Sequence, residues 1–249
     1  MDTILEARQL SRQFGGFFAV KNVDLRVRRH AVHALIGPNG AGKTTCFNLL
    51  TTFLRPSTGQ VIFNGRDISR SDPASVAMAG LIRSFQISAV FGEMTALENV
   101  RVALQKKAGG SFAFWRNVRV LGSLDARAME LLERVGLARW RDTLAGELPY
   151  GRKRALELAT TIAMDPEMIL LDEPMAGLGH EDIAPVVALI REAARGRTVL
   201  MVEHNMKVIA DLCDRVTVLQ AGQVLAEGSY EEVSRNRRVI EAYVGGAHD

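Results

Sequence analysis

The sequence predicts an α/β protein that also contains an antiparallel β region and a helical subdomain. Three observations support this fold class. A glycine-rich loop at residues 37–45 separates a short apolar stretch from a helical one. Residues 168–171 form an uninterrupted apolar run, which is typical of a strand buried on both faces. From Thr95 to about Ala163 the apolar residues instead follow a helical period.

The N-terminal third is expected to form short strands and one helix. Residues 4–27 alternate apolar and polar side chains around a break at Gly15-Gly16, which predicts two antiparallel strands joined by a turn. A strand at residues 33–36 precedes the glycine-rich loop, and a helix continues through Cys46–Leu50. Pro56–Gly59 has the composition of a turn. Further strands are expected at residues 60–65 and 81–85.

The rest of the chain is expected to be helical first and mixed afterwards. One apolar helix face is formed by Leu97, Val100 and Leu104, and a second by Leu124, Ala128, Leu131, Leu132 and Val135. Glycines and aromatic residues at 109–115 interrupt this stretch and indicate a flexible connection that packs on something. Strands are expected at residues 168–171, 198–202, 215–219 and 223–226, and a short helix ends at residues 243–246.

Composition indicates a globular protein. With 249 residues, 47% hydrophobic and 24% charged, the chain can form one core with a subdomain. No apolar run approaches the ~18 residues that cross a bilayer, and the N-terminus lacks a secretory pattern. Cys46 and Cys213 fit a reducing cytosol, lack metal-ligand spacing and are interpreted as structural thiols.

Charge does not favour nucleic acid as a partner. The formal net charge is +3, but the basic residues are scattered. Residues 26–29 alternate basic and apolar side chains as an exposed strand face would, and the densest cluster is Arg152-Lys153-Arg154. No basic platform interleaved with aromatic residues is present in the sequence.

The glycine-rich loop has the pattern G-x-x-x-x-G-K-[ST] of phosphate-binding loops. Glycines let backbone N–H groups curl around a triphosphate, and the following helix directs its positive end at the anion. Lys43 would reach the β- and γ-phosphates, and the Thr44 hydroxyl would join a Mg²⁺ shell. The nucleotide-binding candidates in the loop are Asn39, Gly40, Ala41, Gly42, Lys43, Thr44 and Thr45.

Two further motifs predict what happens to the nucleotide. Asp172 and Glu173 follow the apolar run at 168–171, at the strand end where open α/β sheets bind ligands. Asp172 would complete the Mg²⁺ environment opposite Thr44, and Glu173 would polarise a water that attacks the γ-phosphate. The alternative for this pair is a helix N-terminus. His204 follows the strand at 198–202 and would orient the water, the alternative being a structural histidine.

In order and spacing, these motifs resemble those of ABC-transporter ATP-binding subunits, from about Ile4 to Gly246. The resemblance implies a P-loop NTPase (ABC ATPase) core with an antiparallel β subdomain and an α-helical subdomain. The chain would be one domain, with residues 1–86 and 164–249 as core and about 87–163 as helical subdomain. Gln86 would sense Mg²⁺ and the γ-phosphate as a catalytic and metal-site residue. Phe14, stacked on adenine, and Val20 would bind the nucleotide.

The resemblance also places a signature segment at residues 148–152, which would meet the ATP of a second subunit. Pro149 replaces the usual Ser and offers neither hydroxyl nor N–H, whereas the N–H groups of Tyr150 and Gly151 remain. The positive charges of residues 152–154 either compensate for the lost contact or point to solvent. Gly179 stands where the family has Asp or Asn, which puts the coupling of two sites in doubt.

Finer features resemble the branched-chain amino acid importers, although importers of urea or short amides are similar. These features are residues 91–100, Tyr150-Gly151, residues 202–206 and residues 239–245. The resemblance implies ATP and Mg²⁺ as cofactors and an identical or paralogous second ATPase subunit paired head to tail. It also implies two membrane permeases contacted near Gln86–Met94 and on the helical insertion, the alternative for that segment being core packing. A periplasmic or extracellular binding protein would act through the permeases, and the chain would lie peripherally on the cytoplasmic face of the inner (plasma) membrane.

Two other functions remain open from the sequence. A soluble ABC-type protein acting on ribosomes or DNA usually has two ATPase units or a long coiled coil, whereas this chain has one motif set and no heptad run. A regulatory nucleotide-binding subunit with little turnover remains possible because of Pro149 and Gly179. The chain itself does not identify the transported solute.

Overall fold

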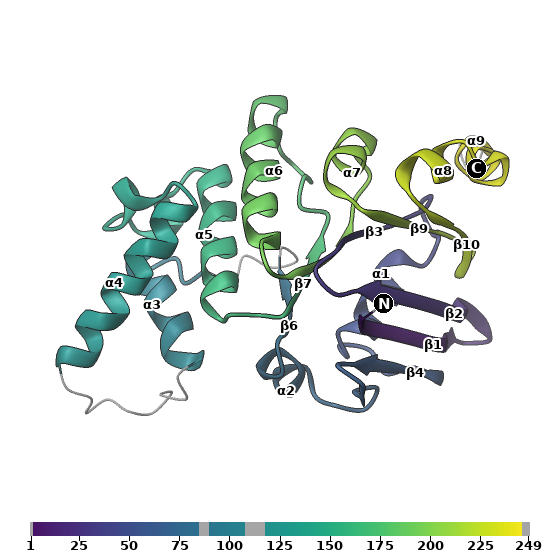
Figure 1. Cartoon of the computed structure of the whole chain (residues 1–249), viewed down its shortest axis with the longest axis horizontal. Helices are drawn as coiled ribbons and strands as arrows, with labels where there is room; N and C mark the ends of the chain where they lie inside the picture. Colours follow the sequence, from purple (N-terminus) through teal and green to yellow (C-terminus); the bar gives the residue numbers. More distant parts are fainter. Residues whose placement is uncertain (1, 85–89, 108–117, 246–249) are drawn as a thin grey trace. The chain divides into compact units, whose positions relative to one another are not determined.

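The structure is a computed structural model that describes residues 2–84, 90–107 and 118–245 (Figure 1). It divides into two compact units. The first unit comprises Met1–Arg83, Met168–Pro174 and Gly196–Asp249, and the second comprises Ser84–Glu167 and Met175–Arg195. Residues 175–195 are thus grouped with the helical part, whereas the sequence assigned them to the core. The arrangement of the chain as a single domain stays a prediction.

A six-stranded sheet of order β10-β9-β3-β8-β7-β6 forms the centre of the first unit. Its strands are β3 (Val32–Ile36), β6 (Leu81–Ser84), β7 (Met168–Asp172), β8 (Thr198–Val202), β9 (Arg215–Gln220) and β10 (Gln223–Gly228). β3 pairs in parallel with β8 and β9, and β7 pairs in parallel with β8. The carboxyl ends of β3, β7 and β8 therefore lie at one edge of the sheet, which is where the predicted motifs begin.

The N-terminal strands form a separate antiparallel sheet of order β2-β1-β4-β5, which confirms the expected strand pair. Its strands are β1 (Thr3–Phe14), β2 (Phe17–Arg28), β4 (Thr58–Phe63) and β5 (Arg66–Asp67). The expected turn at 56–59 is wrong in its second half, because β4 already begins at Thr58. A Cβ on Gly59 would lie 2.3 Å from the Gln9 carbonyl oxygen, so the lack of a side chain here lets β4 approach β1 closely.

Five helices of the first unit connect or cover these strands in the described residues. They are α1 (Lys43–Leu50), α2 (Pro73–Met78), α7 (Met206–Leu212), α8 (Tyr230–Ser234) and α9 (Arg237–Gly245). The apolar side chains of α1 enter the core, where Phe47, Leu49 and Leu50 are fully buried. Burial raises the pKa of the free Cys46 thiol on α1 to about 12, which makes it unreactive.

His33 on β3 makes folding sensitive to acid. The side chain is buried, its Nε2 lies 2.8 Å from the Thr217 hydroxyl, and its pKa is lowered to about 4 by burial and by the charges of Arg215 and Arg28. From pH 6.5 down to about 4, the unfolded chain therefore takes up a proton that the folded chain does not.

We expect this histidine to remove about 3 kcal/mol of unfolding free energy between those pH values. Denaturant titrations at several pH values measure the loss, and His33→Gln should flatten the dependence. The matched control is His30→Gln, which changes an exposed histidine two residues from the end of the preceding strand. An equally steep pH dependence in both variants would count against the assignment to His33.

The second unit is helical, as the sequence predicts. Its helices are α3 (Ala96–Lys107), α4 (Val118–Arg134), α5 (Tyr150–Ala163) and α6 (His180–Ala194), with 3₁₀ turns at Ala138–Trp140 and Ala145–Glu147. α3 packs against α4 and α5, and α5 packs against α6 (Figure 1). The expected α4 face is buried at Ala128, Leu131, Leu132 and Val135. Residues 109–115 lie outside the described part of the chain.

Candidate functional site

The glycine-rich loop connects β3 to α1 and opens the helix without a side-chain cap. Gly42 is the N-cap residue with φ +93°, and a Cβ there would lie 2.3 Å from the Ala19 carbonyl oxygen. A glycine is therefore needed for both the backbone conformation and the close approach. The first turn of α1 contains no acidic residue, and Thr44 is exposed. The N-terminus of α1 therefore has the backbone N–H groups on which the predicted anion contact depends, and that contact stays a prediction.

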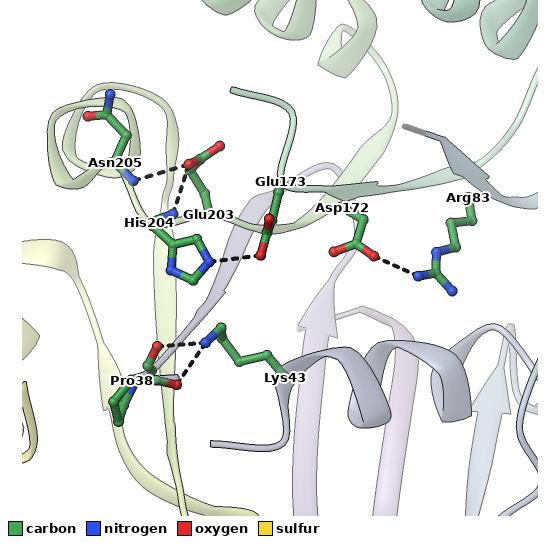
Figure 2. A network of polar contacts seen from close by, with 9 residues as sticks. Pro38, Lys43, Arg83, Asp172, Glu173, Glu203, His204 and Asn205 are labelled. Atoms are coloured by element: carbon green, nitrogen blue, oxygen red, sulfur yellow. Dashed lines mark hydrogen bonds and ion pairs between the residues drawn. The ribbon is translucent and has the colours of Figure 1, made fainter. Parts of the chain in front are cut away.

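Lys43 folds back over the loop. Its Nζ donates to the carbonyl oxygens of Gly37 and Pro38 at 2.7 and 2.9 Å (Figure 2). Burial lowers the pKa of the amine, while the charge of Glu173 acts in the opposite direction. The ammonium is thus held at the loop by groups that a phosphate can replace.

Asp172 ends β7 and is held by Arg83, a residue that the sequence analysis did not single out. The Arg83 Nη2 donates to Asp172 Oδ2 at 2.6 Å, and both side chains are 7% exposed (Figure 2). The available signal was an arginine directly after two apolar residues of a short strand. An unpaired charge there would be costly, so a buried partner was to be expected.

Glu173 and His204 come from neighbouring strand ends and meet directly. Glu173 Oε1 lies 2.8 Å from His204 Nε2 (Figure 2), and the two side chains are 44% and 45% exposed. The backbone of Glu173 has φ +48°, a strained conformation for a residue with a side chain, and its N–H donates to the Val202 carbonyl. The strained turn presents the carboxylate at the open edge of the sheet.

The segment around His204 is fixed by its neighbours. Glu203 is buried and its Oε1 accepts from the backbone N–H groups of His204 and Asn205. The Asn205 side chain in turn caps α7 by accepting from the N–H groups of Lys207 and Val208. The imidazole therefore projects from a backbone that is anchored on both sides.

The predicted adenine-site residues differ in their accessibility. Phe14 is exposed at the end of β1, with the Arg12 guanidinium carbon 4.6 Å from its ring centroid. Val20 on β2 is fully buried, so its side chain presents no surface to a ligand in this arrangement. Gln86 lies outside the described residues.

The signature segment belongs to the second unit, where Pro149 is the N-cap residue of α5. The Tyr150 hydroxyl donates to the Ala176 carbonyl at 3.2 Å and accepts from Arg154 Nη2 at 2.8 Å. Arg154 also pairs with Glu157 and is only 11% exposed. The solvent-facing interpretation of the basic cluster is thus wrong for Arg154, whereas charge compensation for the lost Ser contact stays a prediction.

Gly151 and Gly179 lie close to acidic side chains of α6. A Cβ on Gly151 would lie 3.6 Å from an Asp182 carboxylate oxygen, which is an ordinary contact. A Cβ on Gly179 would lie only 2.9 Å from Glu181 Oε1, so a larger residue there requires that flexible carboxylate to move.

Within the described ranges, no group of three or more His, Cys, Asp or Glu side chains is placed to hold a metal ion. Mg²⁺ that binds together with a nucleotide takes one or two protein ligands and completes its shell with phosphate oxygens and water. Asp172 and Thr44 supply oxygen donors of the required kind.

Comparison with known proteins gives matches along nearly the whole chain. The ABC transporter family model matches residues 20–176, and the model of the branched-chain amino acid ATP-binding cassette transporter matches residues 223–249. The chain is 38% identical over 258 residues to the high-affinity branched-chain amino acid transport ATP-binding protein BraF of Pseudomonas aeruginosa, covering 98% of each. It is 37% identical over 251 residues to the corresponding protein LivG of Escherichia coli K12, again covering 98% of each.

Solved structures also match nearly the whole length of the chain. An ATP-binding cassette of an ABC transporter in its ADP conformation has a TM-score of 0.84 and 29% identity, covering 98% of this chain and 100% of that one. A nucleotide-free cassette has a TM-score of 0.82 and 28% identity, covering 96% and 98%. These likenesses confirm the predicted fold class.

Proposed function

The chain belongs to the ABC transporter family of ATP-binding cassettes, and from this premise we propose that it energises a branched-chain amino acid importer. As a member it is an ATPase that binds nucleotide and works within a transporter. The amino acid cargo is supported by the C-terminal family match at residues 223–249 and by the names of the relatives. Import of urea or short amides is the alternative.

The nucleotide is proposed to bind at the glycine-rich loop together with Mg²⁺. Lys43 would exchange the carbonyl oxygens of Gly37 and Pro38 for β- and γ-phosphate oxygens. Thr44 and Asp172, with Gln86 as the further predicted partner, would hold Mg²⁺, which neutralises developing charge on the phosphates. The remaining loop residues, 39–42 and 45, would contribute backbone and hydroxyl donors.

Hydrolysis is assigned to Glu173, with His204 as its partner. The carboxylate is accessible, lies at the same sheet edge as the loop and carries its hydrogen bond to the imidazole at 2.8 Å. Glu173 would accept the proton of the attacking water, and His204 would donate to the γ-phosphate or hold the water in line. This accessible Glu173–His204 pair is the single observation that most supports turnover over a purely regulatory role.

A second ATPase subunit is proposed to complete each site. Tyr150 and Gly151 open α5 at a helix N-terminus, and Tyr150 is exposed. Paired head to tail, an identical or paralogous subunit would bring this segment to the γ-phosphate of the other chain. Because Pro149 lacks an N–H, the backbone donors of Tyr150 and Gly151 would carry that contact.

The transporter's permeases are proposed to bind near residues 86–94. Phe91 and Met94 are 54% and 37% exposed, so this segment offers apolar surface for such a contact. No helix in the described part of the chain is long and apolar enough to cross a membrane. From the family membership, we propose that the chain lies at the cytoplasmic membrane face, bound to two permeases that receive solute from a binding protein.

Uptake in cells that lack this chain tests the proposed function. Leucine, isoleucine and valine uptake should be lost while urea uptake continues, and the intact chain should restore it. Tagged chain purified from detergent-solubilised membranes should carry two permeases with it. Restoration of uptake by a hydrolysis-deficient variant would contradict the role of turnover, and loss of urea uptake alone would favour the alternative cargo.

A further inference from the structure

Arg83 joins the two elements that carry the proposed Mg²⁺ ligands. Its Nη2 donates to Asp172 Oδ2 at the end of β7, and its Nη1 donates to Asn48 Oδ1 on α1. Asn48 follows Thr44 by four residues, so the two residues lie on the same face of α1. One guanidinium thus connects the carboxylate of β7 with the helix face that carries Thr44.

Two aromatic rings border the Arg83 guanidinium. The guanidinium carbon lies 5.3 Å from the ring centroid of Phe47 and 5.7 Å from that of Phe53. Arg83 and Asp172 are both 7% exposed, so little water competes for the pair. A planar, charged donor bonded to one partner on each element holds Asp172 Oδ2 at a defined position relative to α1.

Asp172 keeps one carboxylate oxygen available. In the described part of the chain, its hydrogen bond is made through Oδ2, and Figure 2 shows the other oxygen directed away from Arg83. A ligand to Mg²⁺, or to a water in its shell, needs only one such oxygen. Outer partners that orient a ligating carboxylate in this way are a general feature of metal sites.

We propose that Arg83 is a positioning residue for the magnesium site, which presents Asp172 Oδ1 to the ion and holds the Thr44 helix at the matching distance. The proposal rests on the proposed use of Mg²⁺ with ATP by this chain. Because Arg83 acts through Asp172 and Asn48, its loss affects the metal-dependent part of nucleotide affinity and spares the metal-free part.

Titrations of the full chain with a fluorescent ATP analogue, in Mg²⁺ and in EDTA, measure these two parts. Arg83→Met should reduce the gain in affinity from Mg²⁺ by about 10- to 100-fold and leave the affinity in EDTA unchanged. Electron paramagnetic resonance with Mn²⁺ and the nucleotide should show half-saturation raised by the same factor. Arg83→Lys should lie between, because a point charge cannot span Asp172 and Asn48.

Two further variants separate positioning from general stability. Arg134→Met breaks another partly buried pair, Arg134 Nη2–Glu192 Oε1 at 2.8 Å, within the second unit. It should lower the unfolding temperature and leave the Mg²⁺ gain unchanged. Asn48→Ala removes only the hydrogen bond between Arg83 and α1, and it should reduce part of the affinity gain from Mg²⁺. If Arg83→Met does not fold, Arg83→Lys and Asn48→Ala decide the question.

The outcomes are distinct. A wild-type Mg²⁺ gain in Arg83→Lys and Asn48→Ala would overturn the proposal, and so would equal losses in Mg²⁺ and EDTA, which indicate a general structural defect. A wild-type chain that shows no gain from Mg²⁺ or Mn²⁺ would instead contradict the proposed cofactor and leave nothing for Arg83 to position.

Discussion

Glu173→Gln is expected to bind ATP like the wild type and to hydrolyse it about 10²- to 10⁴-fold more slowly, the range typical for loss of a general base. The amide is isosteric, and its oxygen can still accept a hydrogen bond from His204, which lies 2.8 Å away in the wild type. It cannot take a proton from water. The strained backbone at φ +48° is set by the chain and not by the charge, so the fold is kept.

Steady-state phosphate release from the assembled transporter measures this loss, and ATP affinity is measured beside it. Glu241→Gln is the matched control, since it makes the same change on α9, where Glu241 pairs with Arg237. His204→Ala should show a smaller loss than Glu173→Gln, because it orients the reaction but does not accept the proton. Undiminished phosphate release from Glu173→Gln would remove the general-base role.

The strand ends of the site were predictable because each motif is local in sequence. Asp172 and Glu173 directly follow an apolar run, and Lys43 belongs to a loop whose sequence pattern predicts phosphate binding. Parallel strands then bring separate local motifs to one edge of a sheet without further information. The meeting of Glu173 and His204 follows from β7 and β8 being neighbours.

Arg83 was not predictable in the same way. Its partners Asn48 and Asp172 lie 35 and 89 residues away in the sequence, and no local pattern connects them. The position of Arg83 after two apolar residues of β6 indicates only that some partner must exist. Side chains that support a site through long-range contacts therefore need the fold before they can be assigned.

Two other features were missed although local sequence signals for them were present. Arg154 lies four residues after Tyr150 and three before Glu157, and both spacings place side chains in contact on a helix. α2 was missed although Asp72 and Pro73 form an N-cap and a first helical residue. In both places the helix rules alone predict the local contacts, which are the Arg154 pair with Glu157 and the Asp72 cap.

Lys43→Met is expected to weaken ATP binding by about 10- to 100-fold, since charged hydrogen bonds of this kind contribute roughly 1.5–3 kcal/mol. The wild-type ammonium already lies at the loop, 2.7 and 2.9 Å from the Gly37 and Pro38 carbonyl oxygens. Burial lowers its pKa by disfavouring the charged form, and the negative charge of a bound phosphate would stabilise the ammonium again. Methionine keeps most of the length of the side chain and loses all of these bonds.

Stabilisation by the nucleotide gives a measure that does not depend on turnover. At an ATP concentration 100 times its Kd, the wild type gains about 2.7 kcal/mol of unfolding free energy. With a Kd raised about 100-fold, the variant gains only about 0.4 kcal/mol at the same concentration. Lys207→Met removes an exposed lysine of α7 and should keep the wild-type shift in unfolding temperature. Glu173→Gln should keep the wild-type shift in unfolding temperature as well, so the Lys43 and Glu173 variants separate nucleotide binding from hydrolysis. Equal shifts in Lys43→Met and the wild type would argue against a phosphate-binding loop.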